Sequence, residues 1–192
     1  MTETSPEAID DAPPAEEQPP VESFSDPEIL RDRAGVRFTH EEAVHDDRDH
    51  CNTDIDGRAV VGVTNDAGEV LLAVHREESV AMLPHGGVEP GDDWAAVARQ
   101  TVEITTELPF EIDGVKVVRE IDHFAKGEDE PHATTYGVVF HASLTGDPKS
   151  ASAESPSHDD NEHWDADWFG EAPENTPEGF DLPEDDIRLF VD

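Results

Sequence analysis

The stretch LPHGGVEPGDDWAAVARQTVEITTEL, residues 83–108, decides how this chain of 192 residues folds. Its first half contains three glycines and two prolines, which predict a loop with tight turns. Asp92 or Asp93 comes next, and either side chain can accept hydrogen bonds from the first backbone N–H groups of a helix. The apolar spacing that follows predicts a helix from about residue 93 to residue 107.

Apolar runs on both sides of this stretch predict strands. Residues 59–63 and 69–74 are two such runs, and the turn sequence of residues 65–68 joins them into a hairpin. Two further strands are expected at residues 115–121 and 135–142, and no internal repeat is visible. Strands that surround one central helix predict the α+β class.

The two ends of the chain differ from this central part. The first 24 residues contain seven acidic side chains and five prolines but no lysine or arginine, and they are too poor in apolar residues to offset the entropy of ordering. We therefore expect a disordered acidic tail there. The chain is thus expected to divide into a tail at 1–24, an extension at 25–57 and a domain at 58–192. The extension should contain a short helix at 26–33 and a short strand at 35–39. The domain should contain a low-complexity insertion at 147–162 and a terminal helix near 184–190.

The charge of the chain is its most unusual property. It has 48 acidic and 12 basic side chains, a formal net charge of −36, and only three lysines. The acidic residues are spread along the chain, and this composition resembles that of proteins from salt-in halophiles. Such a field argues against nucleic acid and anionic membrane as partners. The start of the sequence has no signal-peptide pattern and Cys51 is the single cysteine, so we expect a cytoplasmic protein.

The glycine-rich stretch resembles the box of the Nudix superfamily, whose pattern is G-x5-E-x7-R-E-U-x-E-E-x-G-U and whose usual opening is L-P-G-G-x-V-E-P-G-E. The matching residues are Leu83, Pro84, Gly86, Gly87, Val88, Glu89, Pro90, Gly91 and Asp92, with Trp168 and Phe169 resembling a later W-F pair. The resemblance covers residues 58–192. It implies a mixed sheet packed between helices, box glutamates that hold Mg²⁺ or Mn²⁺, and hydrolysis of nucleoside diphosphates linked to another group.

The helical half of the box departs from this pattern. With Gly86 at the first position, Asp92 takes the place of the first glutamate. The helix positions where the family has one arginine and three glutamates hold Gln100, Thr101, Ile104 and Thr105. A threonine hydroxyl is a poor ligand for a hard divalent cation and an isoleucine is none. The sequence therefore predicts that hydrolysis is weakened or lost.

Other carboxylates could replace the missing ones. Glu89, Asp92, Glu103 and Glu107 are the candidate metal ligands, and Glu89 and Glu103 are the candidate catalytic residues. Glu103, however, lies about 160° around the helix from position 101, so a solvated acidic face is the favoured interpretation of Glu103 and Glu107. A register shifted by one residue, which places Arg99 at the family arginine and Glu103 at a family glutamate, stays open.

The candidate contacts to substrate are the backbone of Gly86 and Gly87 together with the side chains of Arg76 and His85. Two classes of function follow from the resemblance. The chain is either a weakened or re-routed hydrolase, or an inactive sensor or regulatory module that binds a nucleotide-like small molecule. The sequence leaves the nucleotide, a protein partner and a homodimer open.

Overall fold

A computed structural model of the chain describes residues 21–48, 54–75, 80–145, 164–173 and 184–191. The tail expected at residues 1–20 and the insertion expected at 147–162 lie outside these ranges. Within the described part, the helices are too short or too polar for any of them to span a bilayer.

The described residues build one mixed sheet of eight strands. Along its main path the strand order is β1-β6-β7-β2-β3-β4, while β5 pairs with β2 and β8 pairs with β3. The pairs β1–β6 and β2–β7 are parallel, and the other pairs are antiparallel. The strands are β1 (Arg37–His45), β2 (Gly57–Thr64), β3 (Val70–His75), β4 (Val80–Met82), β5 (His85–Val88), β6 (Phe110–Ala125), β7 (Ala133–Leu144) and β8 (Trp164–Phe169).

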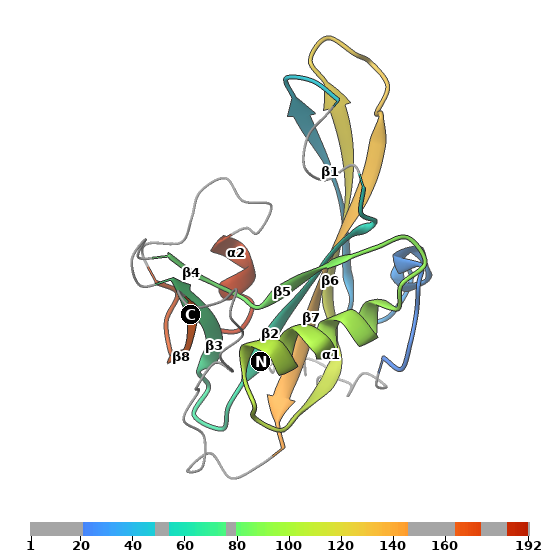
Figure 1. Cartoon of the computed structure of the whole chain (residues 1–192). Coiled ribbons are helices and arrows are strands. Elements are labelled where there is room, and N and C mark those ends of the chain that lie inside the picture. The colour runs from blue at the N-terminus through green and yellow to red at the C-terminus, as the bar shows by residue number, and fades with distance from the viewer. Residues whose placement is uncertain (1–20, 49–53, 76–79, 146–163, 174–183, 192) are drawn as a thin grey trace, which may run out of the picture.

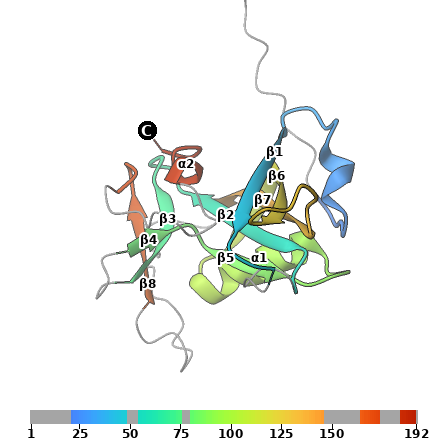
Figure 2. The same ribbon diagram turned by 90° about the horizontal axis from the view of Figure 1, so that it is seen from above.

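Helices cover both faces of this sheet, as the family resemblance implies. Helix α1 (Trp94–Thr105) packs with Ala59 and Val61 of β2 in one core cluster. Helix α2 (Glu184–Ile187) packs through Ile187 with Val60 in a second cluster, because successive side chains of a strand point to opposite faces. Figure 1 and Figure 2 show α1 and α2 on opposite sides of β2. The α+β class and the hairpin of β2 and β3 are thus confirmed.

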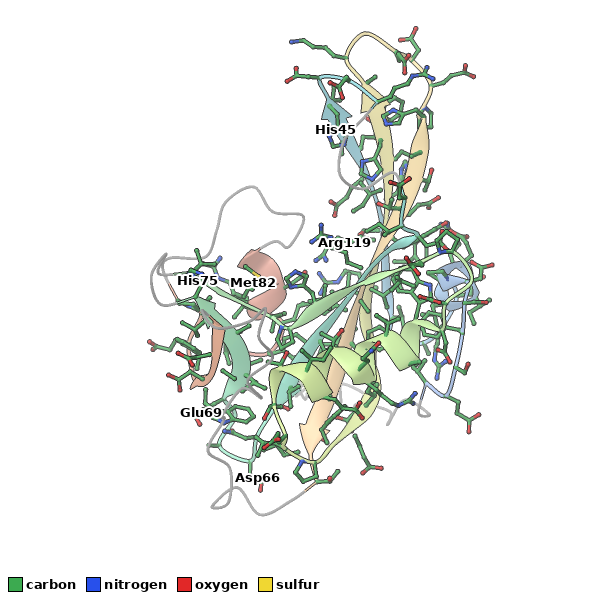
Figure 3. All side chains as sticks on the ribbon, in the orientation of Figure 1. His45, Asp66, Glu69, His75, Met82 and Arg119 are labelled. Atoms are coloured by element: carbon green, nitrogen blue, oxygen red, sulfur yellow. The ribbon has the colours of Figure 1, made fainter. Side chains whose placement is uncertain are left out.

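Three strands extend beyond this body as an arm, formed by β1 and the adjoining parts of β6 and β7 (Figure 1). β6 and β7 are longer than the sequence predicts, and the short strand expected at 35–39 is the nine-residue β1. A partly buried hydrogen-bonded chain crosses the arm: Nε2 of His45 lies 2.8 Å from Nδ1 of the buried His123, whose Nε2 lies 2.8 Å from Oγ1 of Thr135. Figure 3 places His45 on this arm.

The residues before β1 belong to the core. Val21 and Phe24 are buried, and the Phe24 ring stacks on the Trp94 ring with centroids 6.5 Å apart. The Asp93 carboxylate caps α1 by accepting a hydrogen bond from Ala95 N at 2.9 Å, and it also accepts one from Ser23 Oγ at 2.5 Å. The expectation of disorder through residue 24 is therefore wrong for residues 21–24, because their apolar side chains find a hydrophobic partner in α1.

Smaller differences from the expected elements are also present. The helix expected at 26–33 is a single 3₁₀ turn, Pro27–Leu30, and its cap is Asp26. The terminal helix ends at Ile187, earlier than expected. Three short strands, β4, β5 and β8, were not expected at all, and one of them, β5, comes from the stretch interpreted as a loop.

A buried ion pair links the sheet to α2. Nη1 of Arg119, on β6, donates a hydrogen bond to Oδ2 of Asp186 at 3.0 Å, and Nη2 donates to Oδ1. The Asp186 side chain is 2% exposed and that of Arg119 is 13% exposed. Figure 3 shows Arg119 between the sheet and α2.

Candidate functional site

A cavity of about 460 Å³ lies between α1 and the strands β3, β4, β5 and β8. Five helix residues line one wall: Val97, Gln100, Thr101, Ile104 and Thr105. The opposite wall consists of Ala73, Met82, Pro84, His85, Gly86, Gly87 and Asp165. The glycine-rich stretch therefore contributes to both walls of the cavity, with β5 on one side and α1 on the other.

Gly86 allows α1 to lie close to β5. A Cβ atom at position 86 would lie 2.5 Å from Oγ1 of Thr101 and 3.3 Å from Cγ1 of Val97, so a larger residue would push the helix away. Gly91 has a φ of 89°, a left-handed conformation that glycine adopts without strain. These two glycines therefore have packing and turn roles that do not depend on a ligand.

The cavity-facing side of α1 is neutral. The four positions at which the family pattern has its arginine and glutamates all face the cavity, and here they hold Gln100, Thr101, Ile104 and Thr105. Oγ1 of Thr101 donates a hydrogen bond to Val97 O at 2.8 Å, and Oγ1 of Thr105 donates one to Thr101 O at 2.8 Å. Both hydroxyl protons are thus used within the helix.

The candidate metal ligands Glu103 and Glu107 lie elsewhere. Together with Arg99 they line a second hollow of about 600 Å³, which Gly86 and Gly87 do not reach. This separation follows from the helical period, which turns position 103 away from position 101. The residues of the shifted register, Arg99 and Glu103, therefore face away from the cavity.

Glu89 and Asp92 lie in the turn before α1. Asp92 N donates to Glu89 O at 3.0 Å, and Glu89 N donates to Oδ2 of Asp92 at 3.3 Å, so the two residues stabilise this turn. Across the described ranges, no three His, Cys, Asp or Glu side chains are grouped so that they could hold a metal ion. Asp165 is the one carboxylate among the described cavity-lining residues. This donor set does not fit Mg²⁺ or Mn²⁺, which need several oxygen ligands.

His85 is a half-buried histidine in the cavity wall. Its Nδ1 lies 3.1 Å from Leu83 O, and because a carbonyl oxygen only accepts hydrogen bonds, Nδ1 carries the proton. Burial lowers the pKa of His85 below its ordinary value of 6.5, and the nearby positive charge of Arg58 lowers the pKa further, against the opposing effect of the Leu83 bond. At neutral pH the ring is therefore neutral, and Nε2 is an acceptor.

The lowered pKa of His85 predicts how stability depends on pH. The unfolded chain takes up the proton first on acidification, so the free energy of unfolding should fall as pH drops below about 6.5. His85→Gln should flatten this dependence. His40→Gln is a matched control that should change the pH dependence of stability in the opposite direction. The hydrogen bond to Asp122 raises the pKa of His40, so protonation of His40 stabilises the fold at low pH. Chemical denaturation between pH 5 and 8 measures the free energy of unfolding of both variants. If its pH dependence in His85→Gln equals that of the wild type, the lowered pKa of His85 is contradicted.

Arg76, expected to contact substrate, lies outside the described residues. Three residues that the sequence did not indicate, Ala73, Met82 and Asp165, reach the cavity from β3, β4 and β8; Figure 3 labels Met82. The alternation of large apolar and acidic residues in WDADWF, residues 164–169, was a readable signal for a strand.

Comparison with known proteins places the chain in a family. A sequence profile of the NUDIX domain matches residues 54–178, more than half of the chain. Among solved structures, a mutant of the Bacillus subtilis pyrophosphohydrolase BsRppH is similar at 19% identity and a TM-score of 0.37, covering 68% of this chain and 71% of that one. A NUDIX hydrolase from Nitrosomonas europaea is similar at 17% identity and a TM-score of 0.44, covering 72% and 70%. No curated protein sequence matches. The profile match shows that the chain belongs to the NUDIX family.

Proposed function

We propose that this NUDIX-family chain binds a small molecule in the cavity between α1 and β5 and has lost metal-dependent hydrolysis there. The observation that supports this proposal is the neutral helix wall, made of Gln100, Thr101, Ile104 and Thr105. The family resemblance implies a nucleotide-like ligand, so nucleotide derivatives are the first compounds to test. The protein then acts as a sensor or regulatory module.

The chemistry of the wall supports binding over hydrolysis. Hydrolysis of a diphosphate by this family's route needs a divalent cation to neutralise the phosphates and to activate water. Ile104, which is 44% exposed, presents an apolar side chain where the family has a carboxylate. The neutral oxygens of Thr101 and Thr105 bind such a cation weakly, because hard cations prefer carboxylates. The cavity retains the size typical of small-molecule sites.

Turnover in molar KCl with Mg²⁺ or Mn²⁺ tests whether hydrolysis has been lost. We expect the wild type to release no AMP from ADP-ribose above the metal-only background. A variant that restores the box, Thr101→Glu with Ile104→Glu and Thr105→Glu, should gain metal-dependent release. Thermal unfolding and circular dichroism on the same samples show whether the restored variant is folded.

Three matched variants test the alternative that carboxylates outside the cavity hold the metal. Glu103→Gln and Glu107→Gln alter the second hollow, and Glu89→Gln alters the turn before the helix. If the wild type hydrolyses ADP-ribose and Glu103→Gln or Glu89→Gln abolishes the reaction, the chain is a re-routed hydrolase and the proposal is wrong. If the wild type does not turn over, these variants should behave like it.

A further inference from the structure

We infer that the ligand of this cavity is an uncharged, phosphate-free organic molecule with an apolar body and an N–H group that donates a hydrogen bond to Nε2 of His85. This inference rests on the proposed function and names the chemical class of its ligand. It departs from the diphosphate that the family resemblance implies. Three properties of the cavity support it: its charge, the direction of its hydrogen bonds and its apolar surface.

The charge of the cavity disfavours a diphosphate. The described lining residues include no lysine or arginine, and their one charged side chain, Asp165, is acidic. Helix α1 does not compensate, because its lining residues begin at Val97, beyond its first turn, where the positive end of the helix dipole no longer acts. The first turn itself is capped by the Asp93 carboxylate. A phosphate bound among the described lining residues would therefore lose its hydration without a cationic side chain in contact with it, since Arg58, whose charge acts on His85, is not one of those residues.

The hydrogen-bonding side chains of the cavity are chiefly acceptors. His85 gives its Nδ1 proton to Leu83 O, which leaves the lone pair of Nε2 for a ligand. The hydroxyl protons of Thr101 and Thr105 are given to backbone carbonyls of the helix. Among the described lining side chains, the Gln100 amide alone has N–H groups that these bonds do not use. Such a wall complements a donor.

The remaining surface fits an apolar body. Ala73, Met82, Pro84, Val97 and Ile104 contribute hydrocarbon or thioether surface on both walls. A volume of about 460 Å³ holds a small organic molecule, and an apolar ring buried there gains free energy in proportion to the area removed from water. A flat heteroaromatic ring with one N–H is the simplest molecule with these properties.

The test uses indole as the probe, with the full chain in molar KCl. 1-Methylindole has the same ring without the donor, indole-3-acetate adds a negative charge, and ADP is the diphosphate. Titrations followed by ligand-observed NMR should show that indole binds with a Kd of about 5 mM or below. We expect indole to bind about fivefold more tightly than 1-methylindole, the effect of one hydrogen bond. Indole-3-acetate and ADP should bind at least about tenfold more weakly than indole.

A variant pair locates the acceptor. His85→Phe should remove the preference for indole over 1-methylindole, whereas His40→Phe, on β1 and away from the cavity lining, should keep it. The comparison of the two indoles on the wild type stands even if His85→Phe does not fold.

Several results would overturn the inference: no binding of indole at about 5 mM, equal binding of 1-methylindole, or tighter binding of indole-3-acetate or ADP. Tight binding of ADP without turnover would overturn this inference and leave the proposed function standing. Metal-dependent hydrolysis of ADP-ribose would instead overturn the proposed function. The two failures are therefore distinguishable.

Discussion

Arg119→Ala is expected to lower the free energy of unfolding by about 3–5 kcal/mol, because it leaves the carboxylate of Asp186 buried without its cation. Asp186 is 2% exposed and accepts hydrogen bonds from both terminal nitrogens of the guanidinium. Nε of Arg119 also lies 3.5 Å from Oε1 of Glu41 on β1, so the same side chain connects α2 with the edge of the sheet. Chemical denaturation in molar KCl measures the loss.

Two controls separate this effect from loss of packing. The double variant Arg119→Ala with Asp186→Ala leaves neither charge of the pair buried. Its loss in free energy of unfolding should therefore be smaller than the sum of the losses in the two single variants. Arg48→Ala removes the exposed Arg48–Glu128 pair, whose side chains are 65% and 33% exposed, and should cost at most about 1 kcal/mol. A cost for Arg119→Ala no larger than that of Arg48→Ala would show that the buried pair does not stabilise the fold.

Dilution of KCl from molar to tens of millimolar is expected to unfold the protein. The chain has a formal net charge of −36, and its 12 basic side chains are too few to neutralise its 48 acidic side chains. At molar salt the Debye length is about 3 Å and neighbouring carboxylates are screened, whereas at about 0.01 M it is about 30 Å and repulsion acts across the whole molecule. Circular dichroism during dilution measures the transition.

Removal of surface charge should shift this transition. Asp32, Glu42 and Asp66 are exposed, so Asp32→Asn, Glu42→Gln and Asp66→Asn together should move the midpoint to lower KCl without changing the core. Replacement of KCl by sucrose should not protect the fold to the same extent, because sucrose does not screen charge. A spectrum that stays unchanged down to tens of millimolar KCl would mean that the inference of halophilic adaptation is wrong.

The sequence predicted the elements whose signals are local. In the β2–β3 turn, Oδ1 of Asn65 accepts hydrogen bonds from Ala67 N and Glu69 N, an interaction within four residues that the turn sequence indicates. The helix α1 was likewise predicted from its own apolar period and from a cap at Asp92 or Asp93, of which the structure uses Asp93. Strands β5 and β8 depend on partners far along the chain, since β5 pairs with β2 and β8 with β3. Their short segments contain no comparable local signal of which strand they join.

For the candidate site, the sequence predicted the direction of the helix faces but not the composition of the opposite wall. The 100° step of the helix correctly separated Glu103 from Thr101, and the two residues line different hollows. Asp165 reaches the cavity only because β8 pairs with β3, which brings position 165 opposite Val74. The single acceptor nitrogen of His85 follows from its bond to Leu83 O, a contact that no spacing rule predicts.

The contact between Phe24 and Trp94 makes the helix depend on a remote segment. Ser23 and the backbone of Phe24 donate to the same Asp93 carboxylate that caps α1, about seventy positions further along the chain. Trp94 N in turn donates to Phe24 O at 2.9 Å. The stretch that matches the family, residues 54–178, therefore lacks part of its own helix cap and the ring that covers Trp94. We therefore expect a fragment that begins at residue 54 to be less stable than the chain that includes residues 21–24, because it lacks the hydrogen bonds and the ring that these residues give to α1.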